Sequence, residues 1–339
     1  MIRRIAFRGL VAVAVTVLAS ATAGAQAFRT YLAPTGVDTN PCSLQAPCRL
    51  LPAALAAVAD GGEVWMLDSA NYNSATVNVT KSVTILAVPG ALGSVVATNG
   101  PAIRINTAGV KVALRNLVIV PLPGTGAVHG VVLNLGAGLT IDNCLIANMP
   151  TNGVLVNTNA TLRLTDSTIR DNGAVGVALQ NGARATITRA MISGNAQLGV
   201  FAYVTTADTF TTVDVAESTL DGNGAGLLGF IDGGLTAEIS MSIRDSRIVR
   251  NNSNGLGSNG GLGAGTTALT ASNNIISHND GAGIVVYGTG GRVWATGNTI
   301  SYNVTGLWNT VGLLETAGNN SVRNNDTNKS GTITVIAME

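Results

Sequence analysis

A short motif recurs through the chain at intervals of 22 to 28 residues. An aliphatic residue is followed by Asn three positions later, then by Gly and a further aliphatic residue, as in "MISGNAQLGV" at 191–200. The aliphatic position is filled in nine copies by Ile119, Ile146, Ile169, Ile192, Leu220, Ile248, Ile276, Ile300 and Val322. A repeat period of about 20 to 50 residues is typical of solenoid proteins, so the chain is predicted to consist of stacked repeats.

Each repeat contains three short runs in which apolar and polar residues alternate. One run precedes the aliphatic anchor, as at Leu162 and Leu164; one contains the anchor; and one follows the Gly, as at Val177 and Leu179. Alternation with a period of two predicts β-strands. Three strands per repeat predict a three-sided coil whose successive turns stack in parallel, which makes the chain an all-β, single-stranded β-helix solenoid.

Three columns of the repeat have predicted structural roles. The Asn column, from Asn172 to Asn325, is predicted to form a ladder in which each side chain bonds the same atoms on the next coil. The Gly is predicted to let the chain turn without a Cβ penalty before the third strand. The column two residues before the anchor is small and is predicted to face inward, so Cys144 is expected to be a buried small residue rather than a reactive thiol.

The two ends of the chain predict caps. "RLLPAALAAVADGG" (49–62) is typical of a short amphipathic helix that plugs the N-terminal end, and "GTITVIAM" (331–338) is predicted to be a closing strand. The predicted division is a signal peptide at 1–27, a cap with its helix at 28–62, and the solenoid at 63–339. Weaker coils are expected over 63–110, and clear repeats begin at about residue 112.

The first residues predict export. Arg3, Arg4 and Arg8 precede an uncharged apolar run that ends in small residues near Ala25, which is typical of a signal peptide. A membrane anchor is the alternative, but it needs about 20 consecutive apolar residues and this run is shorter. No later segment is long and apolar enough to span a bilayer, so no membrane span is expected in the mature chain.

Charge and cysteine content restrict the partners and cofactors. Removal of the three leader arginines leaves 16 Lys and Arg against 18 Asp and Glu. A chain with this charge balance lacks the positively charged surface that binds nucleic acid, so no nucleic-acid partner is expected. Cys42 and Cys48 predict a local disulfide in an exported protein. A metal site is the rival interpretation, but it would need further ligands, and the only histidines, His129 and His278, lie far away in the sequence. We therefore expect no metal and no cofactor.

The repeats resemble those of the right-handed parallel β-helix, or pectate-lyase-like, superfamily. The segment "TYLAPTGVDTNPCSLQAPCRLLPAALAAVADGGEVWML" also resembles the N-terminal cap and first coil of its secreted bacterial members. The resemblance implies a right-handed coil, but it leaves function open because lyases, hydrolases, epimerases, adhesins and tailspikes share the fold. The Asn-Thr-Asp, Asp-Asp, Gly-His-Gly and Arg-Ile-Lys motifs of polygalacturonase-like enzymes are absent. The Gly-rich "GSNGGLGAGT" (257–266) is predicted to be a loop.

Charged residues form two weak catalytic candidates. The column three residues before the anchor suits either a row of catalytic carboxylates or a surface salt-bridge ladder in which Arg189 lies between Asp166 and Glu217. Arg250 and His278 share a column on neighbouring coils. They suit either an acid/base pair for sugar chemistry or a solvated turn.

Five of the 13 aromatic residues fall on one outward column of the third strand. They are Phe201, Tyr203, Phe230, Tyr287 and Trp308. An exposed aromatic row suits stacking on sugar rings. Cover by loops of the same chain and contact with a second copy of the chain are the alternatives.

These features together predict a secreted or periplasmic carbohydrate-associated protein that binds polysaccharide through the aromatic column without strong catalysis. A polysaccharide lyase or glycoside hydrolase is the enzyme alternative. An adhesin or self-assembling surface protein, which would form homo-oligomers, is the structural alternative.

Overall fold

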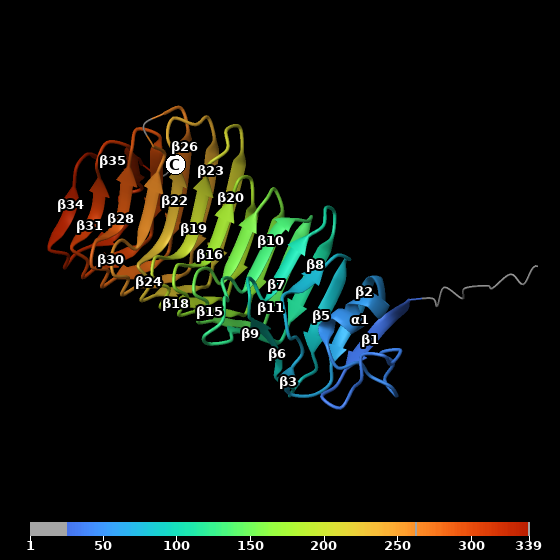
Figure 1. The fold of residues 1–339 in the computed structure, drawn as a ribbon. Helices are drawn as coiled ribbons and strands as arrows, with labels where there is room; N and C mark the ends of the chain where they lie inside the picture. Colours follow the sequence, from blue (N-terminus) through green and yellow to red (C-terminus); the bar gives the residue numbers. More distant parts are fainter. Residues whose placement is uncertain (1–25, 262, 338–339) are drawn as a thin grey trace, which may run out of the picture.

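The computed structural model describes residues 26–261 and 263–337. In these residues the chain winds into a long solenoid of β-strands, with one helix at its N-terminal end (Figure 1). Each strand pairs in parallel with the equivalent strand of the next coil, so three sheets run along the molecule. The predicted all-β parallel β-helix with a short helix is confirmed. The predicted signal peptide lies almost entirely outside the described residues.

The three sheets, named A, B and C, follow one another in each coil. Sheet A contains β1 (Ala27–Leu32), β2 (Val58–Met66), β5 (Val83–Ala87), β8 (Lys111–Arg115), β11 (Gly138–Asp142), β14 (Thr161–Thr165), β17 (Arg184–Thr188), β20 (Phe210–Ala216), β23 (Glu238–Arg244), β26 (Thr266–Ser272), β29 (Gly291–Thr296), β32 (Leu313–Thr316) and β35 (Ile333–Val335). Sheet B contains β3 (Ala70–Asn71), β6 (Gly93–Ala97), β9 (Leu117–Pro121), β12 (Leu145–Ala147), β15 (Thr168–Arg170), β18 (Met191–Ser193), β21 (Thr219–Asp221), β24 (Arg247–Val249), β27 (Ile275–Ser277), β30 (Thr299–Ser301) and β33 (Ser321–Val322). Sheet C contains β4 (Val77–Val79), β7 (Ile103–Asn106), β10 (Val131–Leu135), β13 (Val154–Asn157), β16 (Val175–Gln180), β19 (Leu198–Val204), β22 (Ala225–Ile231), β25 (Leu256–Asn259), β28 (Ala282–Tyr287), β31 (Thr305–Asn309) and β34 (Thr327–Ser330).

The aliphatic anchors form one continuous line inside the solenoid. Ile169 pairs with Ile192 and Ile192 with Leu220, and the register continues in this way from Ile119 to Val322. Most anchors are fully buried. The sequence column is therefore a physical column, and burial of its side chains supplies the apolar core.

The predicted Asn ladder is confirmed. The amide of Asn172 donates to Oδ1 of Asn195 at 2.8 Å, and the same bond recurs on each coil as far as Asn325. Each Oδ1 also accepts the backbone N–H of the preceding Asn, as Asn279 does from Asn251 at 3.1 Å. A second, shorter ladder runs from Asn274 through Asn298 to Asn320. The ladders satisfy polar groups that stacking removes from water.

The predicted role of the repeat Gly is wrong. The φ angles of these residues are not positive; what they provide is space. A Cβ on Gly226 would lie 2.4 Å from the carbonyl oxygen of Gly255 and 2.9 Å from Cγ2 of Ile248. The turns are instead made by single residues with positive φ on either side of the sheet B strands from β12 onward, such as Asp166 (49°) and Asp171 (56°). The repeat Gly lets one coil approach the next, and other residues with positive φ, about half of them Asp or Asn, make the corners.

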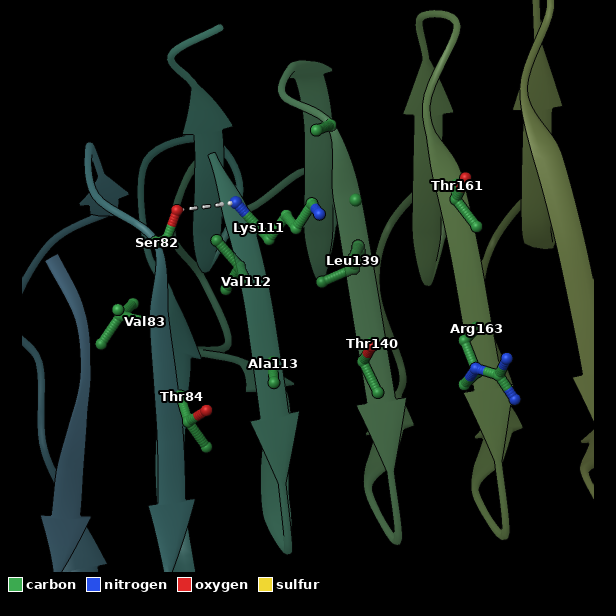
Figure 2. Close-up of a pocket in the computed structure, with 13 residues that line it drawn as sticks. Ser82, Val83, Thr84, Lys111, Val112, Ala113, Leu139, Thr140, Thr161 and Arg163 are labelled. Atoms are coloured by element: carbon green, nitrogen blue, oxygen red, sulfur yellow. Dashed lines mark hydrogen bonds between the residues drawn. The ribbon is translucent and has the colours of Figure 1, made fainter. Parts of the chain in front are cut away.

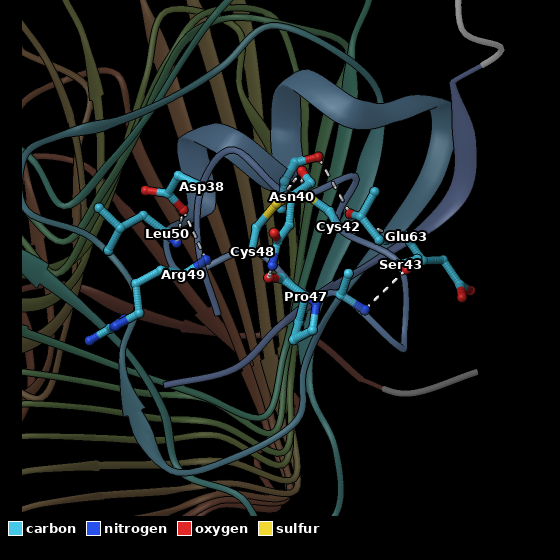
Figure 3. The surroundings of a disulfide bond; sticks show 12 residues. Asp38, Asn40, Cys42, Ser43, Pro47, Cys48, Arg49, Leu50 and Glu63 are labelled. Carbon is cyan, nitrogen blue, oxygen red and sulfur yellow. Dashed lines mark hydrogen bonds between the residues drawn. A yellow bond between two sulfur atoms is a disulfide. The ribbon is translucent and has the colours of Figure 1, made fainter. Parts of the chain in front are cut away.

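The N-terminal cap combines a helix with a disulfide-closed loop. Helix α1 (Leu51–Ala57) is shorter than the predicted 49–62, because Val58 takes an extended conformation and begins β2. Its buried face packs against the first strands. Cys42 and Cys48 are joined by a disulfide with a Cα–Cα distance of 4.6 Å (Figure 3). Oδ1 of Asp38 accepts the backbone N–H groups of Arg49 and Leu50, both at 2.8 Å, and so fixes the chain where it enters the helix.

At the other end, β35 pairs with β32, as Ile333 does with Leu314. Among the described residues, no helix has the length and apolar character needed to cross a membrane.

The ladder predicts a position-dependent stability loss. Asn251→Ala would leave the backbone N–H of Asn223 without its acceptor and would remove one buried partner each from the amide of Asn223, the carbonyl of Leu220 and Oδ1 of Asn279, and we expect a loss of about 3 kcal/mol. Asn325→Ala lies at the solvent-accessible end, where water can replace the bonds, and is expected to cost about 1 kcal/mol. Urea unfolding of both variants measures the difference, and equal losses would contradict a buried ladder.

If the repeat Gly is selected for space, alanine should destabilise the protein more at Gly226, where φ is not positive, than at Gly222, where φ is positive. Gly226→Ala places a Cβ against backbone and is expected to cost about 3 kcal/mol or more. Gly222→Ala has positive φ (61°) but open space around it, and is expected to cost only about 1 kcal/mol. Thermal unfolding compares them; a larger loss in Gly222→Ala would show that conformation, rather than space, selects the repeat Gly.

Candidate functional site

The five predicted aromatic residues lie on the outer face of sheet C. Phe201 and Tyr203 belong to β19, and Phe230, Tyr287 and Trp308 belong to β22, β28 and β31. Their neighbours in the strands, such as Val200 and Ala202, are fully buried, so alternation forces the aromatic side chains outward. Trp308 is 37% exposed and the other four are half-buried. We call these five residues the aromatic face.

The aromatic face is divided into two groups. Phe201 stacks on Tyr203 with ring centroids 5.2 Å apart, and Tyr203 contacts Phe230 at 5.7 Å. Tyr287 and Trp308 meet edge to face at 6.0 Å. Strand β25 lies between the groups and contributes no aromatic side chain.

A hollow of about 600 Å³ lies at this interruption. Phe230 and Tyr287 stand on either side of it, and Asn259 lies between them in register with both. The rest of its lining is Ile231, Gly233, Gly234, Gly261 and Gly288. We call this hollow the slot. It contains no charged side chain.

One wall of the slot is bare backbone. A Cβ on Gly261 would lie 3.0 Å from the carbonyl oxygen of Gly233, and one on Gly288 would lie 2.3 Å from that of Gly261. The glycines therefore stack so closely that side chains cannot enter. The segment 257–266 was predicted to be a loop, but residues 257–259 belong to β25, and Gly261 supplies part of this wall. Its role was missed, although glycine within two residues of the end of each of three neighbouring sheet C strands was a visible signal.

Hydrogen bonds fix the polar groups around the slot. The hydroxyl of Tyr203 donates to Oδ2 of Asp232 at 3.2 Å, and burial together with this carboxylate raises the pKa of Tyr203. The amide of Asn254 donates to the Tyr287 hydroxyl at 3.1 Å. Oδ1 of Asn259 accepts the backbone N–H of Gly261 at 3.0 Å, which orients that amide. Recognition groups held in this way lose little entropy on binding.

The structure places Arg250 and His278 on adjacent coils but gives them separate partners. The guanidinium of Arg250 pairs with Asp221, whereas the ring of His278 stacks on Tyr302 with centroids 4.9 Å apart. Both residues have positive φ (53° and 56°), as the equivalent corner residues of other coils do. Their conformation therefore belongs to the architecture and is not a local strain that marks a site.

In the charged corner column, Arg189 pairs with only one of its two predicted partners. Its guanidinium donates to both carboxylate oxygens of Asp166, at 2.7 and 2.8 Å, and forms no ion pair with Glu217 among the described residues. The hydrogen bonds from Arg189 lower the pKa of the Asp166 carboxyl below its ordinary value.

This pair predicts a measurable titration change. Because the folded pKa of Asp166 is depressed, the pair contributes stability above the ordinary carboxyl pKa and loses it as pH falls through the folded value. Arg189→Ala is expected to raise the pKa of Asp166 towards its ordinary value, as followed by NMR. Arg189→Lys keeps the positive charge but not the bidentate hydrogen bonding, so the pKa of Asp166 in this variant should lie between the other two values. An unchanged value in Arg189→Ala would contradict the pairing.

Sheet A carries a second hollow, of about 540 Å³, that the sequence did not reveal (Figure 2). Ala113 and Gly138 keep it open, and hydroxyl side chains such as Thr140 line it. Lys111 and Arg163 are its charged residues; both are exposed, and among the described residues neither has a carboxylate partner. We call it the basic groove. Its chemistry suits an anionic group.

The placement of potential metal ligands and of the free thiol can be stated for the described residues. They contain no group of three or more His, Cys, Asp or Glu residues placed to hold a metal ion. Cys144 is buried in its column, and burial raises the pKa of its thiol to about 12. A thiol with this pKa is protonated and a poor nucleophile.

Comparison with known proteins identifies the type of repeat. The family described as "Right handed beta helix region" matches residues 102–261. No curated protein matches the chain.

Solved structures share the same architecture at low sequence identity. Pectate lyase Pel9A is 17% identical with a TM-score of 0.60, over 87% of this chain and 78% of the lyase. XylC, solved in complex with xylose, is 8% identical with a TM-score of 0.55, over 83% of this chain and 70% of XylC. The A-module of the Azotobacter vinelandii mannuronan C-5 epimerase AlgE6 is 15% identical with a TM-score of 0.52, over 85% and 95% of the two chains. Similarity at these identities concerns the fold.

Proposed function

This chain has the right-handed parallel β-helix fold of the pectate-lyase-like superfamily, and from that premise we propose that it binds polysaccharide along its aromatic face. The observation that carries the proposal is the group of five aromatic side chains, which lie in two neighbouring columns of sheet C and are left partly open to solvent. Aromatic rings of this kind stack on the apolar faces of sugars. The similar solved structures include a pectate lyase, an epimerase of mannuronan and a complex with xylose, which agrees with a carbohydrate ligand.

The proposal includes an exported protein, either secreted or periplasmic. The leader pattern at residues 1–27 supports export. The disulfide between Cys42 and Cys48 suits an oxidising compartment.

The polysaccharide lyase or glycoside hydrolase alternative has less support. Proton transfer between a sugar and two side chains requires both groups to reach one substrate. Arg250 is engaged by Asp221 and His278 by Tyr302, so the two do not converge. Turnover of a polysaccharide that Arg250→Ala or His278→Ala abolishes would restore this alternative.

A glycan array tests the proposal. The purified full-length chain is expected to bind a subset of polysaccharides, and Phe201→Ala/Tyr203→Ala is expected to weaken binding about tenfold or more, because a stacked aromatic contact contributes about 1 kcal/mol each. Trp294→Ala, a half-buried aromatic of sheet A, is the matched control and should bind like the unaltered protein. Thermal unfolding of each variant separates lost contacts from lost folding.

Two outcomes would move the assignment elsewhere. No binding to any glycan by the folded protein would contradict the proposal. Concentration-dependent oligomers that the same double variant dissolves would assign the aromatic face to contact between copies, as in the adhesin or self-assembly alternative.

A further inference from the structure

We infer that the slot between Phe230 and Tyr287 binds one ring of a neutral sugar and discriminates against acidic sugars. This inference rests on the proposed function and specifies its ligand class. It is carried by the width of the slot, its polar groups and the charge of the whole sheet C face.

The width of the slot fits a single ring. Phe230, Asn259 and Tyr287 occupy equivalent positions on three consecutive strands. Neighbouring strands lie about 4.8 Å apart, which separates the two aromatic positions by roughly 9.6 Å. Carbon atoms in contact lie about 3.5 to 4.0 Å apart, so one saturated ring can touch an aromatic side chain on each side, whereas two rings cannot enter.

The polar groups of the slot suit sugar hydroxyls. With Oδ1 of Asn259 engaged by Gly261, its Nδ2 has no partner among the described residues and is available to donate to a hydroxyl. The glycine wall brings backbone groups to the ligand without side chains in between. A site built to bond hydroxyls with neutral amides recognises uncharged polar ligands.

The charge of sheet C opposes acidic sugars. The eight consecutive strands from β10 to β31 contain no charged residue. The charge next to the slot is that of Asp232, which holds the Tyr203 hydroxyl and would repel a carboxylate. A uronate entering the slot would lose hydration without gaining a cation. On this molecule an acidic sugar is better served by Lys111 and Arg163 in the basic groove.

Calorimetry of the full-length chain with matched hexamers tests the inference. The probes are neutral hexamers of glucose, xylose and mannose, and a hexamer of galacturonic acid. We expect the best neutral hexamer to bind at least about tenfold more tightly than the acidic one at about 150 mM salt. Raising the salt to about 500 mM should change the neutral affinity less than about twofold, because no ion pair contributes.

Variants locate the binding. Phe230→Ala and Asn259→Ala are each expected to weaken neutral binding about tenfold. Asn259→Lys, which adds a cation to the slot, should shift the preference towards the galacturonate hexamer. Asn259 is half-buried, so we expect its variants to fold. They can therefore test the slot even if Phe230→Ala does not fold.

The outcomes separate the inference from the proposed function. Tighter binding of the acidic hexamer that Phe230→Ala abolishes would overturn the neutral slot and leave polysaccharide binding by the aromatic face in place. Acidic binding that only Lys111→Ala and Arg163→Ala abolish would assign that ligand to the basic groove and support a neutral slot. Binding of the neutral hexamers that no sheet C variant changes, or no binding of any hexamer, would contradict both.

Discussion

The hydrogen bond from each Asn amide to the Asn of the next coil is the interaction on which the rest of this structure depends. It joins coils at the corner between sheets B and C, and its donor and acceptor are buried along the middle of the ladder. Because an unpaired buried amide is costly, a coil displaced by one residue would lose both this bond and the inward placement of its aliphatic anchor. The ladder therefore fixes the register of the coils from Asn172 to Asn325 in all three sheets, and with it the residues that become neighbours on the faces of those coils.

Because the register is fixed, equivalent residues of successive coils lie side by side on the surface. Each sheet of the solenoid therefore exposes a different set of side chains. On sheet C the strands from β10 to β31 are uncharged and carry the aromatic face. On sheet A, Lys111 and Arg163 line the basic groove together with Ala113 and Gly138. Side chains suited to apolar stacking and side chains suited to ionic binding thus lie on separate faces of the solenoid.

Features that recur in every repeat could be predicted from the sequence, whereas features that depend on contacts between different coils could not. The anchors, the Asn ladder, the outward aromatic positions and the inward Cys144 follow from periodicity, which physical stacking preserves. The role of Gly226 was missed because its constraint comes from Gly255 on the next coil, which local turn chemistry does not contain. The helix end at Ala57 was missed because pairing of Val58–Met66 in sheet A outweighs local helical preference. The basic groove joins residues from five successive coils with irregular steps, so no single motif marks it.

The slot illustrates why function on a solenoid requires a break in the repeat. Where aromatic residues succeed one another without interruption, they satisfy each other, as Phe201, Tyr203 and Phe230 do through their ring contacts. Continued through β25, the same row would be a closed surface with little room for a ligand. Asn259 replaces an aromatic ring at that step and leaves a space bounded by Phe230 and Tyr287. The regular columns of anchors and Asn residues stabilise the stacking of the coils. The interrupted column contributes less to that stability, so its residues are available to contact a ligand.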